Sequence, residues 1–138
     1  MSDPRYSIVA KTPAIDDYIR LRDITGLSPF SRQAAETGLP GSLHALCVEL
    51  EGHTIGMGRI IGDGGCFVQI VDIAVDPEHQ GQGLGKMIMT ALMAWIDAEL
   101  PASTYVSLLA DVPADQLYAQ YGFKPTAPRT IGMSYRVK

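Results

Sequence analysis

Four absences narrow the class of protein that this sequence can encode. No stretch approaches the run of about 20 apolar residues that a membrane-spanning helix needs. The first six residues lack the apolar core of a signal peptide, so we expect a cytoplasmic protein. The net charge of −4 lacks the basic excess of nucleic-acid binders. Cys47 and Cys66 stand apart, without the spacing of metal ligands. These four absences together lead us to expect no metal, no membrane and no nucleic-acid partner.

What remains has the composition of a small globular domain. The chain has 138 residues, 46% of them apolar, and a mean hydropathy of +0.09. That length supports one hydrophobic core without disulfides or metals. No repeat or low-complexity segment divides the sequence. We therefore expect residues 1–138 to form a single domain.

Hydrophobic periodicity predicts a mixture of strands and helices. The predicted strands are 6–11, 43–50, 54–61, 66–75, 105–110 and 131–137. The predicted helices are one from Thr12-Pro13 to Gly26, with Thr12 as N-cap, then 31–36, a long amphipathic helix from Leu84 to Pro101, and 113–121. The strand at 131–137 is expected because Ile131, Met133, Tyr135 and Val137 alternate with polar residues.

Three glycines at alternate positions, Gly81, Gly83 and Gly85, join the strand at 66–75 to the long helix. Without Cβ atoms, the backbone N–H groups of such a turn can approach phosphate oxygens, and the helix N-terminus adds partial positive charge. A dinucleotide fingerprint would need a glycine where Lys86 or Ile88 stands. The P-loop of nucleotide triphosphatases also fails, because it would need glycine at position 80 and Ser or Thr at 87. The sequence predicts a pyrophosphate site of another kind.

The segment Gln-x-x-Gly-x-Gly, from Gln80 to Gly85, follows a strand that ends in Ile-Ala-Val. This combination resembles the acetyl-CoA loop of the GNAT superfamily of N-acetyltransferases. The resemblance implies an α+β fold with a mixed, mostly antiparallel central sheet, flanked by helices and splayed between its two central strands. It also implies acetyl-CoA as cosubstrate, with the thioester held by backbone groups of the strand at Ile73–Val75.

A second segment is similar to the GNAT pattern Asn-x-x-Ala-x-x-x-Tyr-x-x-x-Gly-Phe. Ala114, Tyr118, Gly122 and Phe123 match it, whereas Asp111 replaces the asparagine. The resemblance implies that Tyr118 protonates the departing CoA thiolate; the alternative is that Tyr118 only packs in the core. A carboxylate at position 111 cannot donate a hydrogen bond as an amide does. Taken together, the implied cofactor contacts are Ile73, Ala74, Val75, Gln80, Gly81, Gln82, Gly83, Leu84, Gly85, Lys86, Asp111 and Tyr118.

A general base is harder to assign. GNAT members often place Glu or His at the positions of Val71 or Gln69, and neither residue titrates. Asp72 is the nearest carboxylate, and Arg59 is its obvious partner if it is buried. Strand alternation places Asp72 on the face opposite Gln69 and Val71, unless a bulge redirects it. Asp72 is therefore either a structural ion-pair partner or a catalytic base or amine anchor, with water as a third candidate for the base. Arg59, Gln69 and Val71 are the expected substrate contacts.

Two functions are compatible with these motifs. The first is direct transfer of an acetyl group from acetyl-CoA to a primary amine of a small molecule. The second is a regulatory module that binds CoA or acetyl-CoA with little or no turnover, because the usual Glu or His is missing. Retention of Tyr118 favours the enzyme, since a binding module needs no acid for a thiolate. A homodimer is compatible with either function.

Overall fold

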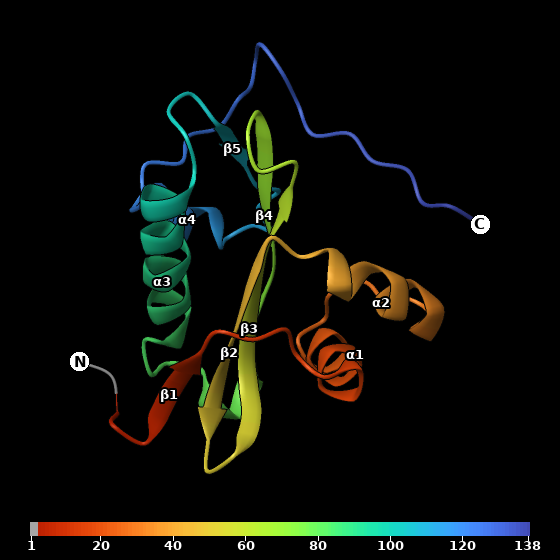
Figure 1. Cartoon of the computed structure of the whole chain (residues 1–138), viewed down its shortest axis with the longest axis vertical. Coiled ribbons are helices and arrows are strands. Elements are labelled where there is room, and N and C mark those ends of the chain that lie inside the picture. The colour runs from red at the N-terminus through yellow and green to blue at the C-terminus, as the bar shows by residue number, and fades with distance from the viewer. Residues whose placement is uncertain (1–2) are drawn as a thin grey trace. The chain divides into compact units, whose positions relative to one another are not determined.

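The computed structural model describes residues 3–138 and divides into two compact units, one ending at Leu108 and one spanning Leu109–Lys138. The first unit is built on a five-stranded sheet in the order β1-β2-β3-β4-β5 (Figure 1). The first four strands are antiparallel, and β5 runs parallel to β4. Their bounds are β1 Tyr6–Val9, β2 His44–Leu50, β3 His53–Gly62, β4 Phe67–Val75 and β5 Tyr105–Ser107. The predicted mixed, mostly antiparallel sheet is confirmed.

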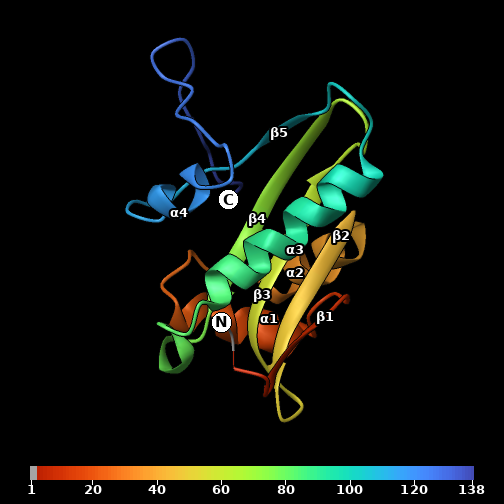
Figure 2. The same ribbon diagram turned by 90° about the vertical axis from the view of Figure 1, so that its left-hand side faces the viewer.

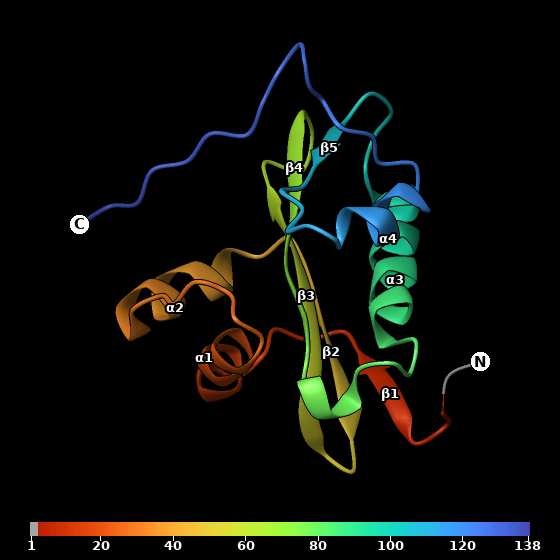
Figure 3. The same cartoon turned by 180° about the vertical axis from the view of Figure 1, so that it is seen from behind.

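Helices cover both faces of this sheet. Helices α1 (Ile15–Ile24) and α2 (Arg32–Gly38) lie on one face, as Figures 1 and 3 show, and a short 3-10 helix at Leu39–Gly41 follows α2. Helix α3 (Leu84–Glu99) runs across the other face, in front of β2, β3 and β4 in Figure 2. Within residues 3–138, no helix is both long and apolar enough to span a membrane.

Each face of the sheet has its own apolar core. On the side of α1 and α2, the buried cluster consists of Tyr18, Leu21, Ala35, Leu39, Met57 and Ala74. On the side of α3, the predicted apolar stripe packs directly on the backbone of Gly58. A Cβ atom at Gly58 would lie 2.8 Å from Ile88 Cγ2 and 3.1 Å from Leu92 Cδ1. Only glycine allows α3 to approach β3 this closely.

The start of α1 differs from the prediction. Thr12 is not the N-cap, because Ala14 remains extended with ψ of 147° and the helix begins at Ile15. No side chain caps this end; instead Asp16 and Asp17 occupy the first turn, where acidic groups interact favourably with the helix dipole. Ser31, by contrast, caps α2 by accepting a hydrogen bond from the backbone N–H of Ala34 at 3.0 Å.

Strand β4 contains a bulge at its centre. Arg59 pairs with Val71 and Met57 pairs with Ala74, so that Gly58 alone faces both Asp72 and Ile73. Asp72 adopts φ of 60°, a left-handed conformation that is uncommon for a residue other than glycine. On the other side of β4, β5 pairs only with Phe67–Gln69. Among the described residues, β4 beyond Gln69 therefore has no strand on that side, which is the predicted splay.

The second unit contains one short helix, α4, at Asp115–Ala119. Gly122 follows it with φ of 92°, as expected for a glycine beyond a helix end. The predicted strand at 131–137 is wrong: these residues form no strand, and their alternate apolar side chains are 68–88% exposed. Alternation shows that one face could be buried, but a strand also needs a neighbour for its backbone hydrogen bonds. The predicted strand at 105–110 is likewise shortened to β5.

Candidate functional site

The glycine loop has the conformation that an anion site requires. Gly81 and Gly83 have φ of 82° and 79°, in the left-handed region that glycine adopts without strain. Gly83 is also the N-cap residue of α3, and no side chain caps this end of the helix. The first N–H groups of a helix have no intrahelical acceptor. Those of Leu84 and Gly85 therefore lie at the start of α3 as donors for an anion.

Hydrogen bonds tie the loop to the end of β4. The Gln80 side-chain amide donates to the Val75 carbonyl at 3.1 Å, and the Asp76 carboxylate accepts from the Glu78 backbone N–H at 2.9 Å. His79 Nδ1 lies 2.8 Å from the hydroxyl of Tyr6 on β1. Gln80 thus links strand and loop, which is a structural reason for glutamine at this position.

Two loop side chains differ in what they offer a ligand. Leu84 is 2% exposed and belongs to the core, so only its backbone is available. Lys86, together with Gln82 and Gly83, lines a hollow of ≈ 490 Å³ beside α3, which Ile8 of β1 also lines. The structure therefore brings the predicted cofactor residues at 80–86 together at one end of α3.

The free edge of β4 follows Gln69 and extends to the point where the loop leaves the strand. The Asp76 N–H donates to the Ile55 carbonyl on β3 at 2.8 Å. Backbone groups of successive strand residues point to opposite sides, so those of Ile73 and Val75 point away from β3. The side chain of Ala74, in contrast, is buried in the core beside α1. Preorganised donors of this kind can polarise a carbonyl group that is held against them.

Asp72 is buried in a network of three donors. Its Oδ2 accepts from Arg59 Nε at 2.8 Å and from the Tyr18 hydroxyl at 2.9 Å. Its Oδ1 accepts a short hydrogen bond from Arg22 Nη1. The side chains of Asp72, Arg22 and Arg59 are 5%, 9% and 10% exposed, respectively. The predicted ion pair between Asp72 and Arg59 is confirmed. Arg22 and Tyr18 extend it into a network that was not predicted.

The bulge corrects the predicted orientation of Asp72. Regular alternation would turn it away from the face that carries Val71, but the extra residue in β4 directs its carboxylate to α1, on the same side as Arg59. Val71 and Gln69 lie half-buried on β4, opposite Arg59 and Ile61 of β3. The bulge thus places the Asp72 carboxylate on the same face of the sheet as the expected substrate residues Arg59 and Val71, and not on the opposite face.

Sequence reasoning missed Tyr18 and Arg22. They are four residues apart on α1, and both are buried. The signal was present in the helix itself: an arginine continues the stripe formed by Ile15, Tyr18 and Ile19, where an apolar residue would be expected. A charged side chain on the buried face of a helix implies a buried partner of opposite charge.

This network leaves little basic capacity for proton transfer. Both oxygens of Asp72 accept hydrogen bonds from fixed donors, which a general base would have to give up. Burial raises the pKa of Tyr18, and the negative charge of Asp72 raises it further. The Tyr18 phenol therefore stays neutral and donates a hydrogen bond to Asp72. The geometry supports the structural interpretation of Asp72.

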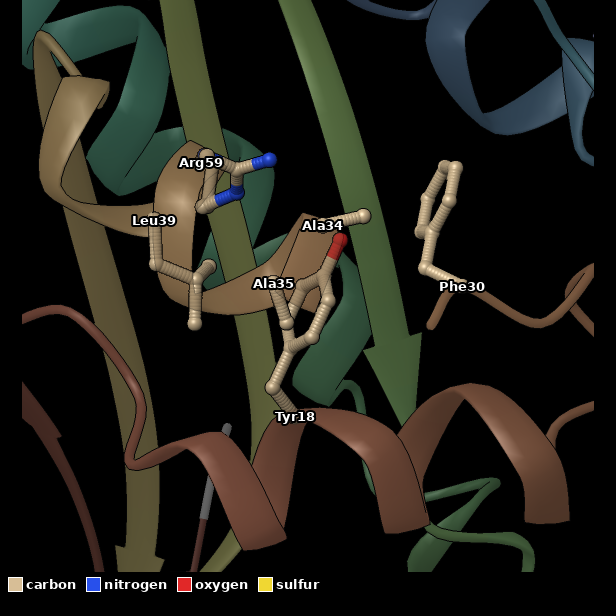
Figure 4. Close-up of a pocket in the computed structure, with 7 residues that line it drawn as sticks. Tyr18, Phe30, Ala34, Ala35, Leu39 and Arg59 are labelled. Carbon is tan, nitrogen blue, oxygen red and sulfur yellow. The ribbon is translucent and has the colours of Figure 1, made fainter. Parts of the chain in front are cut away.

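A cavity adjoins this network on the side of α1 and α2. It has a volume of ≈ 160 Å³ and is lined by Tyr18, Phe30, Ala34, Ala35, Gly38, Leu39 and Arg59. Figure 4 shows the Tyr18 hydroxyl and the Arg59 guanidinium directed into the same space, with Phe30 across from them. Drug-sized pockets begin at about 300 Å³, so this cavity fits only a small molecule or part of one. Apart from Arg59 and Tyr18, its walls are apolar.

Tyr118 and Asp111 belong to the second unit. Burial raises the pKa of the Tyr118 phenol, and the charge of Asp111 adds to this effect. A phenol with a raised pKa keeps its proton at neutral pH, so Tyr118 is present as a hydrogen-bond donor. The role of Tyr118 as an acid, and the contacts of both residues with the cofactor, stay predictions.

Known proteins resemble this chain in both sequence and fold. A family model for an acetyltransferase (GNAT) domain matches residues 41–125. The chain belongs to the GNAT acetyltransferase family. A structure of a probable acetyltransferase of unknown function from methicillin-resistant Staphylococcus aureus is 45% identical, with a TM-score of 0.92 over 96% of this chain and 99% of that one. A GNAT-family acetyltransferase from Streptococcus pneumoniae, 19% identical, shares the fold with a TM-score of 0.76 over 96% of this chain and 98% of that one.

A curated relative is longer than this chain. GCN5-related N-acetyltransferase 2, chloroplastic, from Arabidopsis thaliana is 35% identical over 85 residues, which are 61% of this chain and 32% of that protein. The matched region of the GNAT family model contains β2 to α4, and so both the glycine loop and Asp72. GNAT acetyltransferases are acyltransferases that use acetyl-CoA. Among residues 3–138, no group of three His, Cys, Asp or Glu residues is placed to hold a metal ion.

Proposed function

We propose that this protein transfers an acetyl group from acetyl-CoA directly to a primary amine of a small molecule. The observation that carries the proposal is the glycine loop at the start of α3, next to the free edge of β4. The loop offers N–H donors to a pyrophosphate, and the strand offers them to an acyl carbonyl. If the loop and the strand served only to build the core, neither left-handed glycines at the helix start nor an open strand edge beside them would be needed.

Direct transfer makes three demands on the protein. The amine must be neutral when it attacks, the thioester carbonyl must be polarised, and the departing thiolate needs a proton. The backbone of Ile73 and Val75 is our candidate for the second task, and the Tyr118 hydroxyl is our candidate for the third. Because Asp72 is fully engaged, we assign the first task to water, which can carry the proton to bulk solvent.

Binding of acetyl-CoA tests the loop directly. Gly83→Val places a β-branched side chain at φ of 79°, where nothing lies within 4 Å of the added Cβ, and it should abolish binding by occupying the space of the phosphates. Gly52→Val is the matched control, because Gly52 in the β2–β3 turn has φ of 81° and is equally open. Both variants carry similar backbone strain, about 1–2 kcal/mol. Calorimetry should show lost binding for Gly83→Val alone; equal affinity in both variants would contradict the loop assignment.

Turnover separates the enzyme from the alternative, a CoA-binding module with little activity. The engaged state of Asp72 and the missing acid or histidine at positions 69 and 71 favour that alternative. Release of the CoA thiol should be measured over a panel of primary amines. Amine-dependent release supports the transferase. Tight acetyl-CoA binding without release from any amine supports the binding module.

A further inference from the structure

The network around Asp72 carries an excess of positive charge next to the cavity. Arg22 and Arg59 share one carboxylate, which leaves one positive charge in excess. All three side chains are at most 10% exposed, so water compensates this charge only weakly. Aromatic rings offset part of it: the Arg22 guanidinium lies 4.4 Å from the Phe30 ring centroid, and that of Arg59 lies 5.6 Å from the ring of Tyr18.

The two guanidinium groups differ in what they can offer a ligand. Arg22 donates hydrogen bonds from Nε and Nη2 to the Ser28 carbonyl and from Nη1 to Asp72. Arg59 donates from Nε to Asp72 and from Nη1 to the Ser42 hydroxyl. Arg59 alone lines the cavity, and Figure 4 shows its guanidinium at the cavity wall. Its donors that face the cavity are suited to a planar anion such as a carboxylate.

We propose that the acceptor is an amine that also carries a carboxylate, with the carboxylate bound by Arg59 and an apolar body enclosed by Phe30, Ala35 and Leu39. This inference rests on the proposed acetyl transfer and adds the class of its acceptor. A carboxylate would balance the excess charge of the network. With a cavity of ≈ 160 Å³, the class narrows to compounds of the size of an amino acid with an apolar side chain.

The same charge selects against acceptors that lack a carboxylate. A positive charge near an amine disfavours its protonated form. A lone amine without a carboxylate would therefore be repelled from the cavity as an ammonium ion.

Matched acids and amides test this proposal. We would compare KM in the thiol-release assay for apolar amino acids of increasing size with the KM of their carboxamides, starting with L-leucine and L-leucinamide. The acids should have KM at least about tenfold lower, since each amide loses the charge that pairs with the guanidinium. A lower KM for the acids cannot come from a larger fraction of neutral amine. An amine next to an amide has a pKa of about 8, lower than that of the amine in the free amino acid. Equal or better use of the amide in every pair would overturn the proposal.

Substitution at the cavity wall adds an independent test. Ala34 lines the cavity but is exposed on α2, three residues after its N-cap Ser31. Glutamate is favourable there, so Ala34→Glu should fold, and Ala34→Gln controls for size. Relative to Gln, the Glu variant should raise KM for the acids about tenfold and should not raise KM for the amides, whose ammonium group a carboxylate attracts. An equal KM for the acids in the two variants would contradict a cationic acceptor site.

Direct binding keeps this test separate from the proposed function. If no amine is acetylated and acetyl-CoA does not bind, the transferase proposal fails. Calorimetry with N-acetyl-L-leucine and N-acetyl-L-leucinamide then still reports on the cavity. Binding of the acid alone, weakened by Ala34→Glu and not by Ala34→Gln, supports the carboxylate site. Absence of binding by both compounds, or equal affinity for them, overturns it.

Discussion

Replacing Asp72 by asparagine should destabilise the protein strongly. Asparagine keeps the size and shape of the side chain and tolerates the left-handed φ of 60° at this position, so the backbone adds little cost. The change removes one negative charge that two buried guanidinium groups share. The new NH2 group also faces donors where the carboxylate accepted hydrogen bonds.

The size of the effect follows from the burial of the network. Removing one partner of a buried ion pair costs about 3–5 kcal/mol, because the other charge stays buried without compensation. With a urea m-value of about 2 kcal/mol/M for a domain of this size, the unfolding midpoint should fall by about 1.5–2.5 M. Asp16→Asn is the control: Asp16 pairs with Arg32 at 2.8 Å, but its side chain is 84% exposed. Exposed pairs and acids in the first turn of a helix contribute less than about 1 kcal/mol, so the midpoint of this variant should fall by no more than about 0.5 M.

Two measurements on the Asp72→Asn variant can refute this reasoning. A midpoint equal to that of the Asp16→Asn control would show that the ion network does not stabilise the fold. The kcat of the folded fraction at saturating amine should be retained, because no chemical step passes through Asp72; KM for the amine is free to change, since Asp72 orients Arg59. A stable variant with kcat lowered tenfold or more would instead make Asp72 the catalytic base.

The remaining predictions concern other parts of the chain. Tyr118→Phe should lower kcat by about 10–10³-fold, within the range for the loss of a general acid, with little change in KM for acetyl-CoA; an unchanged kcat with chemistry rate-limiting would leave Tyr118 a packing residue. Gly58→Ala should lower the free energy of unfolding by about 1–3 kcal/mol by overpacking against α3, whereas the open Gly38→Ala should not, and urea titration of both variants checks this. Burial raises the pKa of Cys47 to about 11, so below that pH it stays a thiol. A disulfide reagent at pH 8 should therefore modify only the exposed Cys66 in the folded protein and both cysteines after denaturation. The stability that the protonated Cys47 contributes should decline as the pH rises from 9 toward 11.

Features that depend on neighbouring residues could be predicted from the sequence. The long helix α3 has an apolar stripe that belongs to it alone, and its start needs glycines because the loop itself has positive φ at Gly81 and Gly83. The pair of Arg59 and Asp72 was also predictable, because two adjacent strands of a hairpin carry one charge each in otherwise apolar sequence.

Features that depend on distant residues could not be predicted in this way. Tyr18 and Arg22 reach Asp72 across 54 and 50 residues of sequence, and no local pattern specifies that pairing. The bulge is an exception to strand alternation that the sequence does not specify, because the bulged residue, Asp72, is not a glycine. The strand at 131–137 was predicted wrongly because the alternation of Ile131 and Met133 does not supply a neighbouring strand.

The bulge at Asp72 affects both substrates of the proposed reaction. Its extra residue directs the carboxylate to α1, where it fixes Arg59 at the wall of the cavity. It also shifts the register of β4 just before Ile73 and Val75, whose backbone groups point to the free edge. Because the same residue sets both arrangements, relaxing the bulge would disturb the candidate acyl site and the candidate acceptor site together. This coupling gives a physical reason to place an acid in a left-handed conformation at the centre of a strand, at a local backbone cost that a residue in a regular strand would not carry.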